Sequence, residues 1–179
     1  MTLERIQLIR KAILLAVFVS FFLFFCISAP IYADERIIRF VKWSGFVLIV
    51  FCIIGRTWTS SFIGGRKLYH LVKSGPYSVC RNPLYVFSTI GAAGAGMLSG
   101  SMVLGLLLAA VVATIFAIVV RREEAGMLVI HGADFQEYMV AIPRFIPSFL
   151  LWDSGNAGIV EIKYLIRTLL DAMWILTAI

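Results

Sequence analysis

Charged residues are scarce in this chain of 179 residues: they make up 15% of it, whereas about 25% is usual in soluble domains. Hydrophobic residues make up 61%, against about 45–50% in soluble proteins. This balance excludes a soluble globular domain and an intrinsically disordered chain. The 14 glycines and 5 prolines are near ordinary usage, which excludes a collagen-like repeat. The composition indicates a small integral membrane protein.

Cysteine and histidine are also few. The cysteines Cys26, Cys52 and Cys80 show no CxxC spacing, so nothing supports a disulfide framework or a zinc site. The histidines His70 and His131 stand alone without ligand spacing. We therefore expect no metal. The net charge of +6 comes from basic residues between apolar stretches, which favours the lipid bilayer over nucleic acid as a partner.

Four apolar stretches predict membrane spans, since about 20 apolar residues cross the hydrocarbon core of a bilayer. We predict an all-α, polytopic integral membrane protein with about four transmembrane helices, folded as a single membrane domain over residues 1–179. The predicted spans are residues 12–33, 41–56, 84–98 and 102–120.

The distribution of basic residues predicts the orientation of the spans. With the N-terminus inside, 13 Lys and Arg lie on the cytosolic side and 3 on the outer side, so both termini are expected to be cytosolic. Lys42, Trp43, Arg56 and Trp58 are expected to anchor the short second span at the interface. Residues 158–179 have a charged and an apolar half, which predicts an amphipathic helix on the membrane rather than a fifth span.

A tight helical hairpin is predicted where residues 99–101 join the third and fourth apolar stretches. If the hairpin turns at about residue 100, residue i faces roughly residue 201 minus i, because both arms rise about 1.5 Å per residue. Tyr77 then lies level with Glu124, and Arg81 lies level with about position 120. The fourth helix continues without a breaker to Gly132, a plausible C-terminal stop.

The motif GPYSVCRNPLY, residues 75–85, stands at the cytosolic start of the third span. Asn82 followed by Pro83 predicts a helix start, with Asn as N-cap and Pro at the first helical position. Free N–H groups there, with Arg81 directly before them, form a natural carboxylate or phosphate site. The alternative is an ordinary capped helix with an Arg that anchors at the membrane surface.

Paired acids at the exit of the fourth span form the second motif. Arg121, Arg122, Glu123 and Glu124 stand together, and acids at this depth are costly unless they are solvated or partnered. They are either a solvated helix end or, as the hairpin geometry favours, part of one site with Arg81. In the third span, the small residues at 88, 92 and 96 are expected to let another helix or a long ligand approach closely.

The order of these motifs carries a resemblance. GPY, RNPLY, a helical hairpin, a Glu-Glu pair and a stretch ending in PRFIP follow one another over about residues 71–147. This part, somewhat under half of the chain, resembles the C-terminal half of the isoprenylcysteine carboxyl methyltransferase family and its relatives among the phospholipid N-methyltransferases. In those proteins the R-x-P-x-Y segment and the paired acids help to enclose S-adenosylmethionine at the cytosolic membrane face. The matching positions here are Arg81, Pro83, Tyr85, Glu123 and Glu124.

The resemblance implies an S-adenosylmethionine-dependent integral membrane methyltransferase with a lipophilic acceptor, such as an isoprenylcysteine carboxylate or a lipid. Arg81 is expected to orient an anionic group as the catalytic residue, and Tyr138 and Arg144 to contact the acceptor. The carboxylate, ammonium and ribose of the cofactor call for N–H or Arg donors and for acids. The expected cofactor-binding residues are Tyr77, Asn82, Pro83, Tyr85, Glu123 and Glu124.

Two other functions are compatible with the same residues. A sterol-reductase-like enzyme would bind NADPH and would usually have a longer chain. A non-catalytic membrane subunit would leave the paired acids as a solvated helix end.

Overall fold

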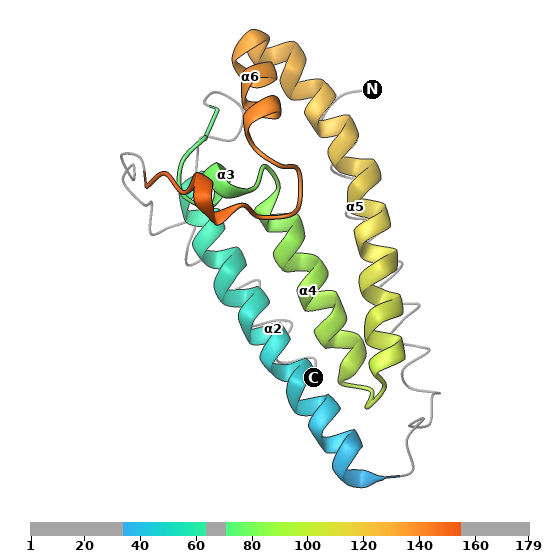
Figure 1. Cartoon of the computed structure of the whole chain (residues 1–179). Helices are drawn as coiled ribbons and strands as arrows, with labels where there is room; N and C mark the ends of the chain where they lie inside the picture. The colour runs from blue at the N-terminus through green and yellow to red at the C-terminus, as the bar shows by residue number, and fades with distance from the viewer. Residues whose placement is uncertain (1–33, 64–70, 155–179) are drawn as a thin grey trace. The chain divides into compact units, whose positions relative to one another are not determined.

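The computed structural model describes residues 34–63 and 71–154, and within these ranges the protein contains helices and no strands (Figure 1). The elements are α2 (Glu35–Ile63), α3 (Pro76–Val79), α4 (Pro83–Met97), α5 (Met102–His131), α6 (Ala133–Ala141) and the 3-10 helix η1 (Phe149–Leu151). The all-α prediction is therefore confirmed for the described residues. The predicted first span, residues 12–33, and the predicted amphipathic helix, residues 158–179, lie outside them.

Two helices are long and apolar enough to cross a membrane, namely α2 with 29 residues and α5 with 30. At 1.5 Å per residue each is about 45 Å long, which exceeds the hydrocarbon core of about 30 Å. Helix α4 matches the predicted third span closely, but its 15 residues measure only about 22 Å. The structure thus supports a membrane protein with two candidate spans, and the four-span prediction is not confirmed.

Helix α2 begins earlier and ends later than the predicted span 41–56, because that prediction followed apolar residues only. Asp34 explains the early start: its Oδ1 accepts a hydrogen bond from the backbone N–H of Arg36 at 2.8 Å. This caps one of the free N–H groups at the helix end. Glu35 in the first turn adds a favourable interaction with the helix dipole.

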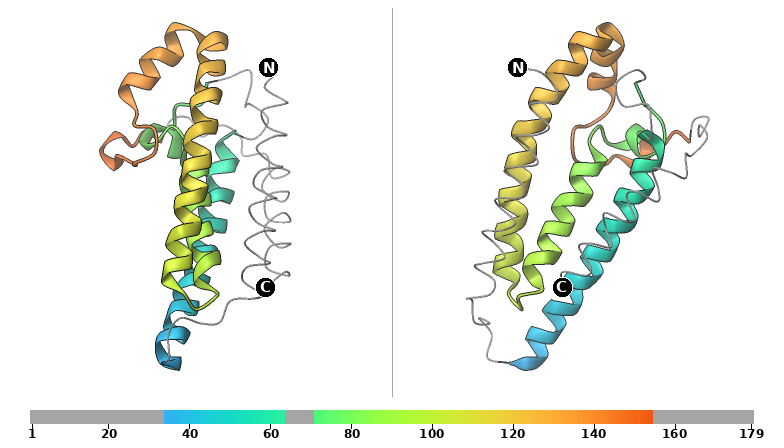
Figure 2. Two further views of the ribbon diagram at one scale, coloured as in Figure 1. Left: turned by 90° about the vertical axis from the view of Figure 1, so that its right-hand side faces the viewer. Right: turned by 180° about the vertical axis from the view of Figure 1, so that it is seen from behind.

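The predicted hairpin between α4 and α5 is present (Figure 2). Gly100 turns the chain with φ +86°, a conformation that L side chains rarely adopt. Ser101 caps the start of α5, since its Oγ accepts a hydrogen bond from the N–H of Leu104 at 3.3 Å. The two arms of the hairpin meet closely: a Cβ added to Gly96, before the turn, would lie 2.6 Å from the Cα of Gly105, after it. The rule that residue i faces residue 201 minus i is therefore confirmed at this pair.

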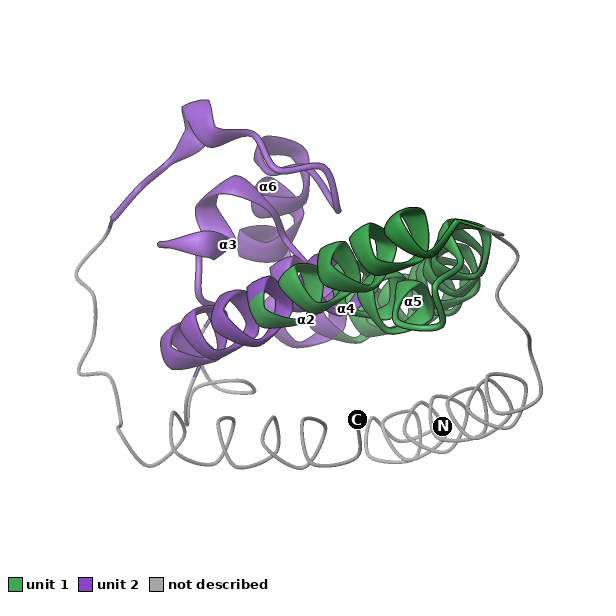
Figure 3. Cartoon of the chain, turned by 90° about the horizontal axis from the view of Figure 1, so that it is seen from below, with its two compact units in different colours: residues 1–50, 89–126 green, residues 51–88, 127–179 purple. Residues whose placement is uncertain are grey.

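Two compact units divide the described residues (Figure 3). One contains the beginning of α2, the end of α4 and α5 up to Gly126; the other contains the end of α2, the beginning of α4, α3, α6 and η1. In the first unit, α2 and α4 pack closely at two glycines. A Cβ added to Gly45 would lie 2.7 Å from the backbone oxygen of Gly94, and a Cβ added to Gly94 would lie 2.6 Å from the backbone oxygen of Gly45. At the predicted position 96, the contact of Gly96 with Gly105 confirms that a small residue in α4 lets another helix approach; Gly94 is a further such residue, outside the predicted positions.

Helix α5 has one buried face in the first unit. Its buried residues recur every three or four positions, which is the spacing of one side of a helix. The face consists of Gly105, Leu108, Val112, Phe116, Val119, Val120 and Glu124. A carboxylate therefore continues an otherwise apolar stripe. As predicted, α5 runs on to His131 and ends at Gly132, where φ is +55°.

Candidate functional site

The second unit is built around the turn that contains α3. Gly75 has φ +61°, and a Cβ there would lie 2.3 Å from the ring of Phe62, so only glycine fits. Pro76 then occupies the start of the four-residue helix, where its missing N–H costs no hydrogen bond. All four residues of α3 are buried. The Gly-Pro pair thus folds Tyr77 inward instead of leaving it on a surface loop.

Residues 143–153, which we call the strap, run along this turn and are bonded to its backbone (Figure 1). The N–H of Arg81 donates to the carbonyl of Pro143 at 2.9 Å, and the N–H of Ser148 donates to the carbonyl of Val79 at 2.9 Å. At the far end, the N–H of Gly75 donates to the carbonyl of Asp153 at 2.7 Å. The strap and the 75–82 segment therefore form one layer.

Tyr77 and Tyr138 are both buried in this layer, but their hydroxyl groups differ in hydrogen bonding. The hydroxyl of Tyr138 donates to the backbone carbonyl of Tyr77 at 2.7 Å. The hydroxyl of Tyr77 has no hydrogen-bond partner among the described residues, although it is buried. Burial raises the pKa of the Tyr77 phenol well above its ordinary value; Tyr138, Cys80 and Tyr85 raise it further, and Arg56 opposes the shift. Tyr77 therefore presents a neutral O–H donor that nothing in this part of the protein uses.

Arg81 and Asn82 join the start of α4 to the strap and to α6. The Arg81 Nη1 donates to the carbonyl of Met139 in the last turn of α6 at 2.9 Å, where a cation also suits the helix dipole. Asn82 Nδ2 donates to the carbonyl of Arg144 at 3.3 Å. The carbonyl of Asn82 accepts from the N–H groups of Tyr85 and Val86 at 3.1 and 3.3 Å. Helix α4 begins at Pro83 as predicted, so this helix start is confirmed.

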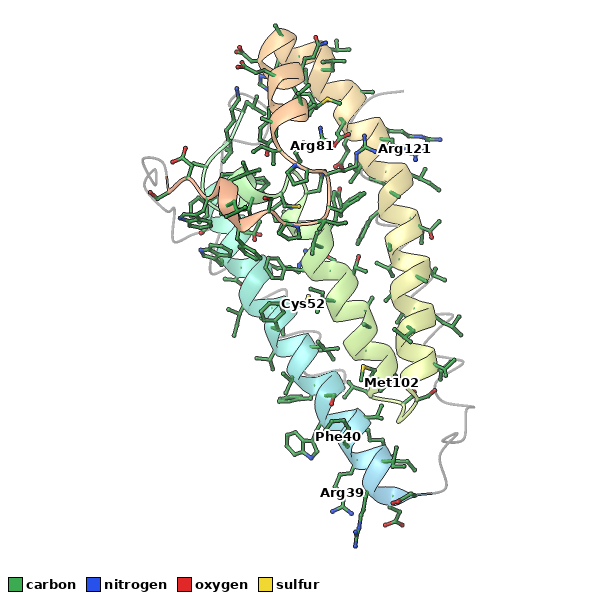
Figure 4. The ribbon with its side chains drawn as sticks, in the orientation of Figure 1. Arg39, Phe40, Cys52, Arg81, Met102 and Arg121 are labelled. Atoms are coloured by element: carbon green, nitrogen blue, oxygen red, sulfur yellow. The ribbon has the colours of Figure 1, made fainter. Side chains whose placement is uncertain are left out.

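The structure therefore brings six predicted site residues into one compact unit. They are Tyr77, Arg81, Asn82, Pro83, Tyr138 and Arg144, of which all but Pro83 take part in the hydrogen bonds above. Tyr85 lies in the first turn of the same α4 helix. Figure 4 labels Arg81 beside the α6 segment.

Arg56 is a residue whose place in the site the sequence did not indicate. We expected it to anchor α2 at the interface, but its Nη1 donates to the Oγ of Ser88 on α4. Ser88 thus gives the guanidinium a partner within the protein, and the anchoring role stays a prediction. The signal in the sequence was its isolation: Arg56 is the one charged residue in α2 after Lys42. Ionisable residues inside membrane helices usually have functional partners.

Glu123 and Glu124 belong to the first unit, on α5. Glu124 is only 6% exposed, whereas Arg121 and Arg122 are exposed, and Figure 4 shows Arg121 pointing away from the buried side of the helix. The tetrad is thus not uniformly solvated, which disfavours the interpretation as a solvated helix end. The predicted position of these acids opposite Tyr77 and Arg81 stays a prediction.

Comparison with known proteins identifies the family. The sequence model of the phospholipid methyltransferase family matches residues 40–134, slightly more than half of the chain. The chain belongs to the phospholipid methyltransferase family. This confirms the resemblance that the order of the motifs indicated. The match includes the 75–85 motif and the paired acids of α5, while Tyr138 and Arg144 follow its end.

Two curated relatives of this family member are proteins of metal resistance. The chain is 34% identical over 132 residues to the nickel-cobalt-cadmium resistance protein NccN of Alcaligenes xylosoxydans xylosoxydans, which covers 74% of this chain and 62% of that protein. It is 33% identical over 132 residues to the cobalt-zinc-cadmium resistance protein CzcN of Cupriavidus metallidurans, covering 74% and 61%. The chain thus spans about three fifths of the length of these relatives. No solved structure matches it.

The described residues of this phospholipid methyltransferase family member contain no group of three or more His, Cys, Asp or Glu that could hold a metal ion. The described cysteines, Cys52 and Cys80, are not in disulfide bonds. Cys80 is fully buried, and its Sγ donates weakly to the carbonyl of Phe145 at 3.3 Å. It fastens the strap instead of presenting a reactive thiolate.

Proposed function

We propose that this family member transfers a methyl group from S-adenosylmethionine to a lipophilic acceptor at the cytosolic face of the membrane. The observation that carries the proposal is the buried hydroxyl of Tyr77, which lacks a partner among the described residues. A buried polar group without a partner costs about 1–3 kcal/mol. Such a cost is typical of a site that a ligand completes.

The residues present have the chemistry that S-adenosylmethionine requires. When bound, it supplies an electrophilic methyl group on a sulfonium, together with a carboxylate, an ammonium and a ribose. Glu123 and Glu124 would accept hydrogen bonds from the ammonium and the ribose hydroxyls. The donors would be the hydroxyl of Tyr77 and a backbone N–H in the first turn of α4, the helix that Pro83 begins. Pro83 itself has no N–H, and the N–H of Tyr85 already donates to the carbonyl of Asn82.

The acceptor is assigned to the strap side of the second unit. Arg81 would orient an anionic group, while Tyr138 and Arg144 would contact the acceptor. The contribution of the protein is to position the reacting groups and to exclude water, because methyl transfer needs an aligned nucleophile close to the methyl carbon. A lipophilic acceptor would enter sideways from the bilayer, where it is already concentrated.

Calorimetry on the full chain in detergent tests the proposal. S-adenosylmethionine should bind and NADPH should not. Glu124→Gln should weaken binding about 10-fold or more, the equivalent of a hydrogen bond to a charged group, and Tyr77→Phe about 2- to 10-fold. Arg121→Gln is the matched control on the exposed side of α5 and should leave the affinity unchanged. Binding of NADPH instead would indicate the reductase, and binding of neither a non-catalytic subunit.

A role in tolerance of divalent metals is the second function, favoured by the names of the two relatives. It extends the first, because a methylated lipophilic product would act on the membrane across which metals are moved. Cells expressing the wild-type protein should grow at higher cobalt concentrations than cells expressing Glu124→Gln at equal protein levels. Equal growth of the two strains would separate the metal phenotype from methyl transfer.

A further inference from the structure

The strap carries an exposed apolar surface. Leu150 is 99% exposed and Phe149 77%, and no charged residue stands between Arg144 and Asp153. Contiguous exposed apolar patches of this kind mark interaction sites rather than ordinary protein surface. The surface consists of Ile146, Phe149, Leu150, Leu151 and Trp152.

This surface is continuous with an apolar stripe of α2. Large exposed apolar residues recur along α2 every three or four positions and so occupy one side of the helix. The stripe consists of Phe40, Trp43, Val47, Phe51, Ile54 and Trp58. Its last member, Trp58, stacks on Trp152 of the strap with ring centroids 5.9 Å apart and planes 14° from parallel. The exposed side of a candidate membrane span therefore leads directly into the strap.

The strap is not itself a span. Its eleven residues contain one short 3-10 helix, η1, and a membrane-spanning helix needs about 20 residues. Part of its backbone is bonded within the strap: the N–H of Leu151 donates to the carbonyl of Ser148 and that of Trp152 to the carbonyl of Phe149, at 3.1 and 3.2 Å. A segment with tryptophan, apolar side chains and satisfied N–H groups suits the headgroup boundary, where Trp concentrates.

We propose that the strap lies in the plane of the membrane and inserts the side chains of Phe149 and Leu150 into the lipid headgroup boundary. The continuity with α2 through Trp58 and Trp152 favours lipid over a second copy of the chain as the occupant. Because the strap is bonded to the 75–82 segment, its depth fixes the depth of Tyr77 and Arg81. The inference goes beyond the proposed activity and holds whatever the site binds.

A fluorescence experiment on the full chain in phosphatidylcholine vesicles tests the depth of the strap. Leu150→Cys would be labelled with the environment-sensitive probe NBD in a background in which Cys26 and Cys52 are serine; the fully buried Cys80 stays. Quenching would be measured with shallow and deep doxyl lipids and with aqueous iodide. We expect ~2-fold stronger quenching by the shallow than by the deep doxyl lipid, since interfacial segments insert only about 5–10 Å.

Glu137→Cys is the matched control, because Glu137 is exposed on α6 in the same unit. Its probe should be quenched by iodide and not by lipid. Three results at residue 150 would overturn the proposal. Strong iodide quenching would place the strap in water, stronger quenching by the deep lipid would place it in the hydrocarbon core, and protection from all three quenchers would indicate a second copy of the chain.

Discussion

Tyr77 and Tyr138 differ in what their hydroxyl groups do for folding. The Tyr138 hydroxyl donates to the carbonyl of Tyr77, whereas the buried Tyr77 hydroxyl lacks a partner in the described part of the chain. Tyr138→Phe should therefore lower the free energy of unfolding by about 1 kcal/mol. Tyr77→Phe should leave it unchanged or raise it by up to about 1 kcal/mol, since a desolvated donor is removed. Thermal unfolding of both variants in the same detergent measures the contrast; equal destabilisation would argue that Tyr77 is an ordinary structural residue.

Cys80 predicts a pH dependence of stability. Burial raises the pKa of its thiol to about 11, while an unfolded cysteine titrates near 8.5. The folded state thus holds the proton more tightly, so the stability contribution is complete below about pH 8.5 and is lost as the pH rises towards 11. Unfolding followed from pH 8 to 11 should show a decline that is shallower in Cys80→Ala. Cys52→Ala is the control and should retain the wild-type slope. An identical slope in all three proteins would contradict this origin of the decline.

Sequence reasoning succeeded at residues whose role is local and failed where the partner is distant. Asn82 and Pro83 predict the start of α4 correctly, because capping depends on the neighbouring backbone. The contact of Arg56 with Ser88 joins residues 32 positions apart, and hydropathy alone gave no sign of it. The lone hydroxyl of Tyr77 was equally invisible, since satisfaction of a donor depends on everything packed around it.

At the scale of elements, the α4–α5 hairpin followed from the sequence because its turn is short and its arms rise equally. Its close contact predicts the effect of a single methyl group. Gly96→Ala would place a Cβ 2.6 Å from the Cα of Gly105, and backbone cannot move aside as a flexible side chain does. We expect a loss of about 1–3 kcal/mol in unfolding free energy. Ala110→Leu adds more volume at an exposed position of α5 and should be close to neutral; similar losses in both would show that the close contact is not the cause.

The strap was the element that the sequence described least well. Its PRFIP sequence contributed only to the family resemblance, because the structure of the strap comes from hydrogen bonds to residues 75–82 and not from a helical or strand period. The length of α2 was also underestimated, since its capped and polar ends carry no hydropathy signal.

The strap leads to a prediction about activity. Phe149→Ser combined with Leu150→Ser should reduce incorporation of labelled methyl groups into membrane lipid by about 5- to 10-fold, because each lost apolar contact is worth up to about 1.5–3 kcal/mol. The affinity for S-adenosylmethionine should not change. Val129→Ser combined with Val140→Ser removes two equally exposed apolar side chains elsewhere in the same unit and should leave incorporation intact. Equal loss of incorporation in both double variants would show that the effect comes from a more polar surface in general and not from the strap.

For the whole molecule, the basic residues predict how the chain crosses the membrane. With 13 Lys and Arg on one side and 3 on the other, residue 73 should face the cytosol and the α4–α5 turn should face outward, because positively charged segments are retained inside. Lys73→Cys and Met102→Cys test the two sides; both positions are exposed, and Met102 adjoins the turn without the capping role of Ser101. In a background in which Cys26 and Cys52 are serine, an impermeant maleimide should label residue 102 in intact cells and residue 73 only after lysis. Labelling of residue 73 in intact cells would show that the topology is the reverse of the predicted one. The 75–82 segment, with Tyr77 and Arg81, would then lie on the outer side, away from cytosolic S-adenosylmethionine. This one measurement therefore bears on the proposed activity as well as on the orientation of the chain.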